Sequence, residues 1–372
     1  MRATLLILAL LPLPLLADSL DPERLKKIDK AVEAAIERGD CPGAVLVVVH
    51  DDEIAFRKAF GHRALQPEKQ PMTVDTVFDL ASLTKPIATA TSIFVLIEQG
   101  KLKLSEKVAT YWPEFAANKK DTVTVEHLLL HTSGLLADNA LADYRTGKAD
   151  AMKKIAALKL EAEPGKRFRY SDVGFIVLGE LVERISGKSL TGFAKSHVFE
   201  PLAMHDTGYL PSDKLKTRCA PTAQRDGKWI VGDVHDPRAF AMNGVAGHAG
   251  LFGTAEDLAR FARMLLKEGE LDGNRILKAE SVKSLTTPID VPGGKRSHGW
   301  DVDTAFSSPR GNRFPKGQGF GHTCVRRRTQ AMRRAGHVGS NGGPDRQEER
   351  QQGERPAEIG WMIEQIGDDA PP

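Results

Sequence analysis

A serine and a lysine stand three residues apart, at Ser82 and Lys85, in the stretch Asp-Leu-Ala-Ser-Leu-Thr-Lys. A serine hydroxyl is a weak nucleophile at neutral pH and needs a base within hydrogen-bond reach. Residues three apart share one face of a helix, and a desolvated lysine can act as that base. A helix N-terminus also supplies N–H groups for a developing oxyanion. The pattern indicates nucleophilic catalysis, although a capping serine beside a surface lysine has the same spacing.

Two later stretches carry residues that suit the same chemistry. Tyr170-Ser171-Asp172 follows a Pro-Gly turn, and a tyrosine near the serine–lysine pair can relay a proton. Gly321-His322-Thr323 lies in an expected strand, where hydrogen-bonding side chains can hold a substrate carboxylate or carbonyl. The candidate catalytic residues are Ser82, Lys85 and Tyr170, and the candidate substrate-binding residues are Asp172, His322 and Thr323.

Other polar patterns in the sequence fit structural roles better. His127 and His131 are four apart and could form a metal pair, but no third ligand is placed beside them. We therefore expect them to pack and cap a helix, and we expect neither a metal nor a cofactor. His235, Asp236 and Arg238 either line the rim of the pocket or fix a loop.

Regular elements must position these residues. Apolar periodicity predicts helices at residues 22–38, 82–99, 125–130, 174–185 and 257–266. Alternating or continuous apolar runs predict strands at residues 43–49, 54–60, 300–302 and 314–320. Strands, then many helices, then strands indicate an α/β fold whose sheet is packed by helices, with a mostly helical insertion.

Five stretches together resemble one known family. Residues 78–85, 127–134, 170–172, 234–238 and 244–250 are similar to motifs of the serine β-lactamase and penicillin-binding protein superfamily, on its class C β-lactamase, DD-peptidase and esterase branch. The resemblance runs from Leu25 to Thr323. It implies an antiparallel sheet flanked by helices, a mostly helical subdomain at roughly 100–250, and an active site between the two.

The resemblance also implies roles for the candidate residues. Ser82 would form an acyl-enzyme, and Lys85 and Tyr170 would share general acid–base duty. His322 and Thr323 would stand for the Lys/His-Thr-Gly strand, and the oxyanion would be bound by the N–H groups of Ser82 and Val325.

Asp172 departs from the family pattern, because many relatives carry asparagine there. An ionised aspartate accepts hydrogen bonds but donates none, and it can pair with Lys85 and raise the lysine pKa. Turnover of β-lactams is therefore in doubt, whereas peptide and ester substrates stay open.

The first residues indicate export. Arg2 precedes an apolar run from Leu5 to Leu16, which predicts a signal peptide at 1–17 that is too short to span a bilayer. The product would be periplasmic or secreted. The net charge of +3 indicates no nucleic-acid partner. Cys41 and Cys219 are interpreted as ordinary small apolar residues.

The pattern changes abruptly after Thr323, where Cys324 replaces the glycine of the family motif. Residues 324–372 hold eight arginines and no lysine. We predict a catalytic domain at 18–323 and an aberrant, disordered tail at 324–372, with the terminal strands of the sheet lost. Our hypothesis for the change is a frameshift, and weakened activity would follow from it.

These observations predict a serine hydrolase of the β-lactamase or D-Ala-D-Ala carboxypeptidase kind. The expected substrates are a cell-wall peptide, a β-lactam or a small ester. One alternative is a carboxylesterase of the same fold. Another is an impaired pseudoenzyme or binding protein, which the altered tail favours.

Overall fold

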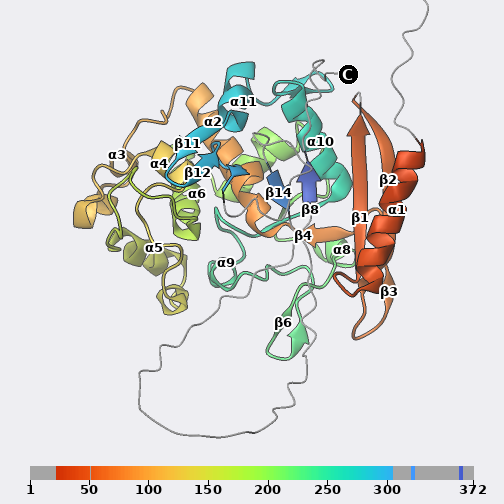
Figure 1. The fold of residues 1–372 in the computed structure, drawn as a ribbon. Coiled ribbons are helices and arrows are strands. Elements are labelled where there is room, and N and C mark those ends of the chain that lie inside the picture. The colour runs from red at the N-terminus through yellow and green to blue at the C-terminus, as the bar shows by residue number, and fades with distance from the viewer. Residues whose placement is uncertain (1–21, 51, 305–319, 323–359, 363–372) are drawn as a thin grey trace, which may run out of the picture.

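The first elements form a small unit at one flank of the molecule. The computed structural model describes residues 22–50, 52–304, 320–322 and 360–362. Helix α1 (Pro22–Glu37) packs on β2 (Glu53–Ala64), which pairs with β1 (Gly43–His50) and β3 (Gln70–Pro71) in an antiparallel sheet. This confirms the helix and hairpin predicted from the sequence. Figure 1 shows this unit on one flank and α5 on the other, with β4, β8 and β14 between them.

Two further sheets follow. One has the order β4 (Val77–Asp79), β8 (Leu251–Thr254), β5 (Gly208–Tyr209). The other has five antiparallel strands in the order β11 (Ile289–Val291), β12 (Gly294–Arg296), β13 (Asp301–Asp303), β14 (Phe320–His322), β15 (Gly360–Met362). Two small hairpins complete the described strands: β6 (Gln224–Arg225) with β7 (Lys228–Trp229), and β9 (Glu270–Leu271) with β10 (Asn274–Arg275).

Strand β15 differs from the sequence expectation. Residues 324–372 were predicted to be disordered, yet Gly360–Met362 pairs with β14, with His322 opposite Gly360. The described residues thus include one strand beyond Thr323, and the predicted disorder of the rest of the tail stays a prediction. The remainder of the tail lies outside the described residues, as do the predicted signal peptide and residues 314–319 of the strand expected at 314–320.

Between β4 and β5 the described chain holds helices, turns and loops, with an isolated β-bridge between Lys107 and Thr124. Its α-helices are α2 (Thr91–Glu98), α3 (Val108–Tyr111), α4 (Val125–Leu129), α5 (Lys148–Ala156), α6 (Asp172–Ser186) and α7 (Leu190–Ala194). The later helices are α8 (Asp213–Lys216), α9 (Pro237–Ala241), α10 (Ala255–Leu266) and α11 (Ala279–Thr286). The helical stretch predicted at 82–99 is continuous from Ala81 to Glu98. It begins as a 3₁₀ turn (Ala81–Leu83), widens to a π-helical turn (Lys85–Ala90) and ends as α2.

Helix α6 is the central helix of this region. The Ser171 hydroxyl caps its N-terminus by accepting the N–H of Gly174, and Gly187 ends it in a left-handed conformation. Most of its residues are buried, and it contacts α2, α4 and α7. Gly247 allows its own backbone to approach the backbone of α6 very closely. A Cβ added to Gly247 would lie 1.9 Å from the Phe175 carbonyl oxygen.

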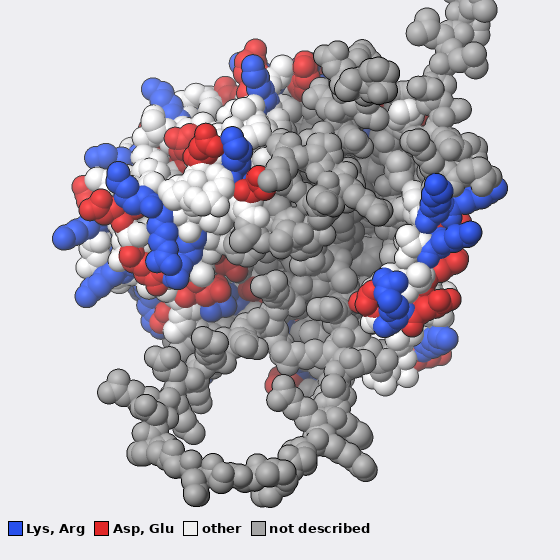
Figure 2. All heavy atoms as spheres, in the orientation of Figure 1, with Lys and Arg blue, Asp and Glu red and all other residues white. Residues whose placement is uncertain are grey.

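The surface carries charges of both signs. Figure 2 shows lysine and arginine interspersed with aspartate and glutamate on both described flanks of this face. Among the described residues, no helix is both long and apolar enough to cross a bilayer.

Candidate active site

Ser82 lies at a sharp turn between strand and helix. Strand β4 ends at Asp79, which is buried, and the next residues reverse direction through Ala81, whose φ of 47° is left-handed. Such a backbone conformation is costly for a residue with a Cβ and persists only where neighbouring contacts hold it. The Asp79 carboxylate supplies one such contact by accepting the Ala81 N–H at 2.9 Å. Ser82 then opens the helical stretch and is partly exposed.

Lys85 lies on the same face as Ser82, as the spacing predicted. Its Nζ donates to Ser82 Oγ at 2.9 Å and to the His248 carbonyl oxygen at 3.2 Å. A third contact places Nζ 2.6 Å from Asp172 Oδ1. Because Lys85 is only 1% exposed, these partners stand in for water around its charge.

The Lys85–Asp172 ion pair decides the protonation state of the lysine. Burial alone would lower the pKa of Lys85, but the charges of Asp172 and Tyr170 and hydrogen bonds to both raise it well above its usual value. Of the two possibilities drawn from the sequence, a desolvated lysine and a lysine paired with Asp172, the structure has the second. Lys85 is therefore held as an ammonium that donates to Ser82 Oγ.

Tyr170 lies against this pair. The Lys85 Nζ is 4.7 Å from the centre of its ring, and the His131 ring stacks on it with 4.5 Å between centroids. His131 accepts the Ser171 N–H at Nδ1 at 3.0 Å. Burial, followed by the charges of Arg296 and Lys85, lowers the pKa of His131 well below its usual value, so this ring is neutral.

The two histidines weighed as a metal pair have other roles. His127 completes a capping box with Thr124 at the start of α4, where its Nδ1 accepts the Thr124 N–H at 3.2 Å. His131 packs against Tyr170 as described above. Both thus serve packing and capping, as the sequence analysis favoured.

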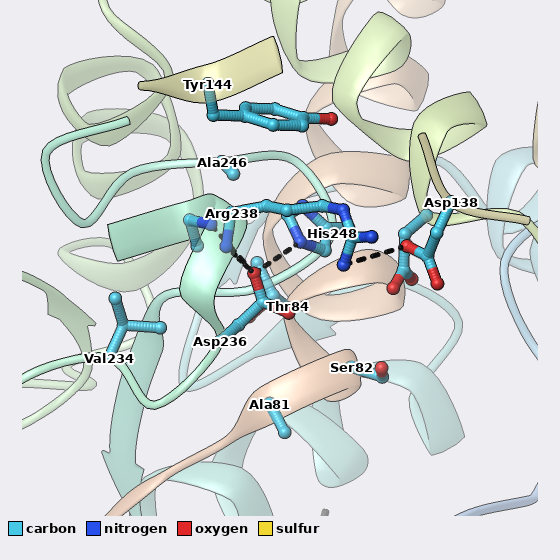
Figure 3. Close-up of polar contacts among 12 residues, drawn as sticks. Ala81, Ser82, Thr84, Asp138, Tyr144, Val234, Asp236, Arg238, Ala246 and His248 are labelled. Carbon is cyan, nitrogen blue, oxygen red and sulfur yellow. Dashed lines mark hydrogen bonds and ion pairs between the residues drawn. The ribbon is translucent and has the colours of Figure 1, made fainter. Parts of the chain in front are cut away.

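Asp236, His248, Arg238 and Asp138 form a second polar cluster (Figure 3). Asp236 is the N-cap residue that precedes α9. It accepts the N–H of Ala239 at 2.7 Å, while its Oδ1 lies 3.0 Å from His248 Nε2. Burial would raise the pKa of Asp236, but the charge and hydrogen bond of His248 bring it well below its usual range. Arg238 reaches Asp138 across 3.5 Å and donates to the Asn139 carbonyl.

One group of side chains in this cluster could hold a cation. Ligand atoms of Asp172, Asp236 and His248 all lie within 4.8 Å of one another. The Lys85 ammonium, 2.6 Å from Asp172 Oδ1, already supplies a positive charge there and opposes a divalent ion.

His322 and Thr323 are only partly placed. His322 ends β14, which pairs with β13 through Phe320 opposite Asp301 and so joins the sheet that contains Arg296. Its side chain, and the whole of Thr323 and Val325, lie outside the described residues. Their expected substrate-binding and oxyanion roles stay predictions.

Two buried residues near the site, Asp79 and Arg296, have no role that the sequence predicts. Asp79 could have been found as an acidic residue at the end of a strand, just before a strand-to-helix turn. Arg296 could have been found as a charged residue in a short strand pattern. Neither signal identifies the residue's partner. For Asp79 that partner is His235, which lies 156 positions away along the chain.

The chain belongs to the β-lactamase family, the serine β-lactamase and penicillin-binding protein superfamily, because the family model described as Beta-lactamase matches residues 28–347. An Escherichia coli K12 protein named "Putative D-alanyl-D-alanine carboxypeptidase" is 31% identical over 340 residues, covering 81% of this chain and 77% of that protein. The Bacillus subtilis 168 N-acetylmuramyl-L-alanine amidase is 32% identical over 301 residues, covering 72% and 68%.

Solved structures show the same fold. The octameric penicillin-binding protein homologue of Pyrococcus abyssi has a TM-score of 0.63 at 23% identity, over 75% of this chain and just under two thirds, 65%, of that one. EstCE1, a hydrolase with promiscuous acyltransferase activity, has a TM-score of 0.64 at 24% identity, over 80% and 88%. At these identities the likeness establishes the α/β fold, with its antiparallel sheets and helices, and nothing finer.

Proposed function

We propose that this protein is a serine hydrolase that cleaves an amide or ester bond through an acyl-enzyme on Ser82. The observation that carries the proposal is the contact of Lys85 Nζ with Ser82 Oγ at 2.9 Å, beside the Tyr170 ring. Buried lysine next to a partly exposed serine at a strained turn is arranged for nucleophilic catalysis rather than for packing.

Because Lys85 is protonated, Lys85 and Tyr170 have different roles in the proposed reaction. As an ammonium, it orients the Ser82 hydroxyl and stabilises negative charge near it. Tyr170 is then the proton acceptor when Ser82 Oγ bonds to the substrate carbonyl carbon, and it returns the proton to the leaving group. In this proposal the Ser82 N–H, at the start of the helical stretch, donates to the oxyanion. Water releases the acyl group in the second half of the reaction.

The proposed substrate is a cell-wall peptide ending in D-alanine, in keeping with the name of the E. coli relative. A β-lactam could acylate the same serine. This proposal includes export by the predicted signal peptide, since such substrates lie outside the cytoplasm.

A carboxylesterase is the second candidate, and Asp172 favours it. Its carboxylate is committed to Lys85 at 2.6 Å and cannot donate a hydrogen bond to an amide carbonyl. Esters are more reactive than amides and depend less on such a donor.

The test is covalent labelling of the purified chain with a fluorescent penicillin, with the adduct mapped by peptide mass, beside turnover of p-nitrophenyl butyrate. Ser82→Ala is the active-site variant. Ser186→Ala is the matched control, because that hydroxyl donates to the Lys188 carbonyl at the opposite end of α6 from Asp172. An adduct on Ser82 that only Ser82→Ala loses supports the proposal. Ser82-dependent ester turnover without an adduct supports the carboxylesterase. If neither the adduct nor ester turnover is seen, a binding protein is the remaining interpretation.

A further inference from the structure

The loop before α9 carries two consecutive side chains, His235 and Asp236, that take no part in the proposed reaction. The sequence left open whether they line the pocket or fix a loop. Both are largely buried, with 20% of the His235 side chain and 18% of the Asp236 side chain exposed. Each bonds to a partner from another part of the chain, and one partner leads to Ser82 while the other leads to Lys85.

The contact of His235 leads to the nucleophile. Its backbone N–H and its ring Nδ1 both bond to one oxygen of Asp79, whose side chain is fully buried, at 2.9 and 2.8 Å. The second Asp79 oxygen accepts the Ala81 N–H. The left-handed conformation of Ala81 is costly and persists only where its neighbours hold it. His235 therefore fixes the carboxylate that fixes the strained turn directly before Ser82.

The contact of Asp236 leads to the lysine. In Figure 3 the Asp236 carboxylate points toward the His248 ring, whose Nε2 lies 3.0 Å away. An ionised carboxylate can only accept, so Nε2 carries the proton of this hydrogen bond. His248 is 1% exposed, and its main-chain carbonyl oxygen accepts Lys85 Nζ at 3.2 Å. Asp236 therefore fixes the residue whose backbone helps to aim the lysine at Ser82 Oγ.

Other hydrogen bonds tie the loop at 247–251 to the helical stretch without these two side chains. The Thr89 hydroxyl donates to the Gly247 carbonyl at 2.7 Å, and the Leu251 N–H donates to Thr84 Oγ1 at 3.1 Å. Because these contacts remain, we expect loss of the His235 or Asp236 side chain to displace the reacting groups rather than to unfold the chain.

We propose that His235 and Asp236 are positioning residues that hold the nucleophile and its lysine in register, His235 through Asp79 and Asp236 through His248. The inference rests on the proposed function. Because the two residues are neighbours in the chain, one short loop sets both halves of the pair. Nucleophilic attack is sensitive to such placement, since an error of about 1 Å can lower a rate about a hundredfold.

His235→Ala tests the half that leads to the nucleophile. It should lower kcat for p-nitrophenyl butyrate about a hundredfold with little change in KM, because the reacting group is misplaced while the binding groups stay. His235→Asn is the matched variant, since its side-chain amide can replace ring Nδ1 as the donor to Asp79, and it should recover most of kcat. Wild-type kcat in folded His235→Ala, or no recovery in His235→Asn, overturns the proposal.

The variants of Asp236 must separate its contact with His248 from its capping of α9. Asp236→Asn keeps an oxygen for both, whereas Asp236→Ser keeps a capping oxygen on a side chain one bond shorter. We expect kcat to fall by at least about tenfold in Asp236→Ser and to stay near the wild-type value in Asp236→Asn. Equal kcat in the two variants overturns the proposal.

Ser189→Ala is the control for loss of a helix cap. Ser189 caps α7 by accepting the Gly192 N–H at 3.1 Å. This variant should leave kcat unchanged, and a loss as large as that of Asp236→Ser would contradict a positioning role.

A double substitution tests the connection through Asp79. In an Asp79→Asn background the contact with His235 is already broken, because the amide nitrogen cannot accept, so His235→Ala should lower kcat little further. A full additional loss in that background would show that His235 acts by another route and would contradict the proposal.

Amide hydrogen exchange of the full chain tests the hold on the turn without any turnover. Peptides covering residues 79–85 should exchange faster in His235→Ala than in the wild type and His235→Asn, while peptides of α5 should not change. Unchanged exchange at 79–85, or equally faster exchange in α5, overturns the local role. If the wild type shows no Ser82-dependent turnover, the proposed function fails, and this measurement still decides whether His235 holds the turn.

Discussion

The buried carboxylate of Asp79 accepts two hydrogen bonds from His235, one from the backbone N–H at 2.9 Å and one from ring Nδ1 at 2.8 Å. The other oxygen of the same carboxylate accepts the Ala81 N–H. One side chain thus ties the turn that presents Ser82 to the loop that leads into Asp236 and α9. Loss of this contact would release both segments together.

The Asp79–His235 pair should make stability depend on pH. Burial would lower the pKa of His235, but the hydrogen bond and charge of Asp79 raise it above 6.5. A raised pKa gives stability that is fully present below the unfolded value and lost as pH rises through the folded one. We expect the free energy of unfolding to fall as the pH rises past 6.5 and through the raised pKa of His235. Urea unfolding at several pH values measures it. His235→Gln should flatten that slope, and an identical slope in the variant would contradict the assignment.

Asp172→Asn should make Lys85 easier to deprotonate. The Asp172 charge is the chief cause that raises the lysine pKa against burial, so its removal lowers that pKa. Lys85 can then accept the Ser82 proton, and asparagine can donate to a substrate carbonyl. We expect penicillin acylation of Ser82 at pH 7 to rise about tenfold, and its alkaline rise to begin at lower pH.

Asp172→Ala is the matched control for that experiment, because it removes the charge without adding a donor. Rate constants for acylation between pH 6 and 10 distinguish the two contributions. Rates that fall in both variants at every pH would mean that the ion pair itself is required.

Gly247→Ala should destabilise the fold strongly. The added Cβ would lie 1.9 Å from the Phe175 carbonyl oxygen, which belongs to the backbone of α6 and cannot rotate away. We expect a loss of about 3 kcal/mol or more in the free energy of unfolding, measured in urea. Gly208→Ala is the control, since nothing lies within 4 Å of its added Cβ and its φ is ordinary. A loss of similar size in both variants would argue against the close approach.

Cys219 should resist alkylation in the folded chain. It is 3% exposed, and burial raises the pKa of its thiol to about 11, so very little reactive thiolate exists at pH 7.5. Iodoacetamide followed by peptide mass should modify it only in urea. Cys41 is the internal comparison because it is more exposed. Rapid labelling of Cys219 in the native state would show that this region opens readily.

The sequence allowed the central pair to be predicted because helical spacing is local. Ser82 and Lys85 needed only a helix through both. The sequence could not decide whether Lys85 is paired with Asp172. That depends on where Asp172 lies, and Asp172 belongs to another helix, α6. Asp79 and His235 meet across 156 positions, and no periodicity relates them. Strand β15 was missed because its pairing with β14, rather than an apolar run of strand length, defines it.

The π-helical turn at Lys85–Ala90 has a consequence for chain length. Such a turn amounts to one residue inserted into an α-helix. Deleting Ala88 would let the segment tighten to an ordinary helix and rotate everything before it by about 100° relative to α2. Ser82 and Lys85 would turn together, still one turn apart, but away from Asp172. Any relative that shares this π-helical turn is therefore constrained here in the number of residues as well as in their identity, and an alignment should show gaps less often than substitutions.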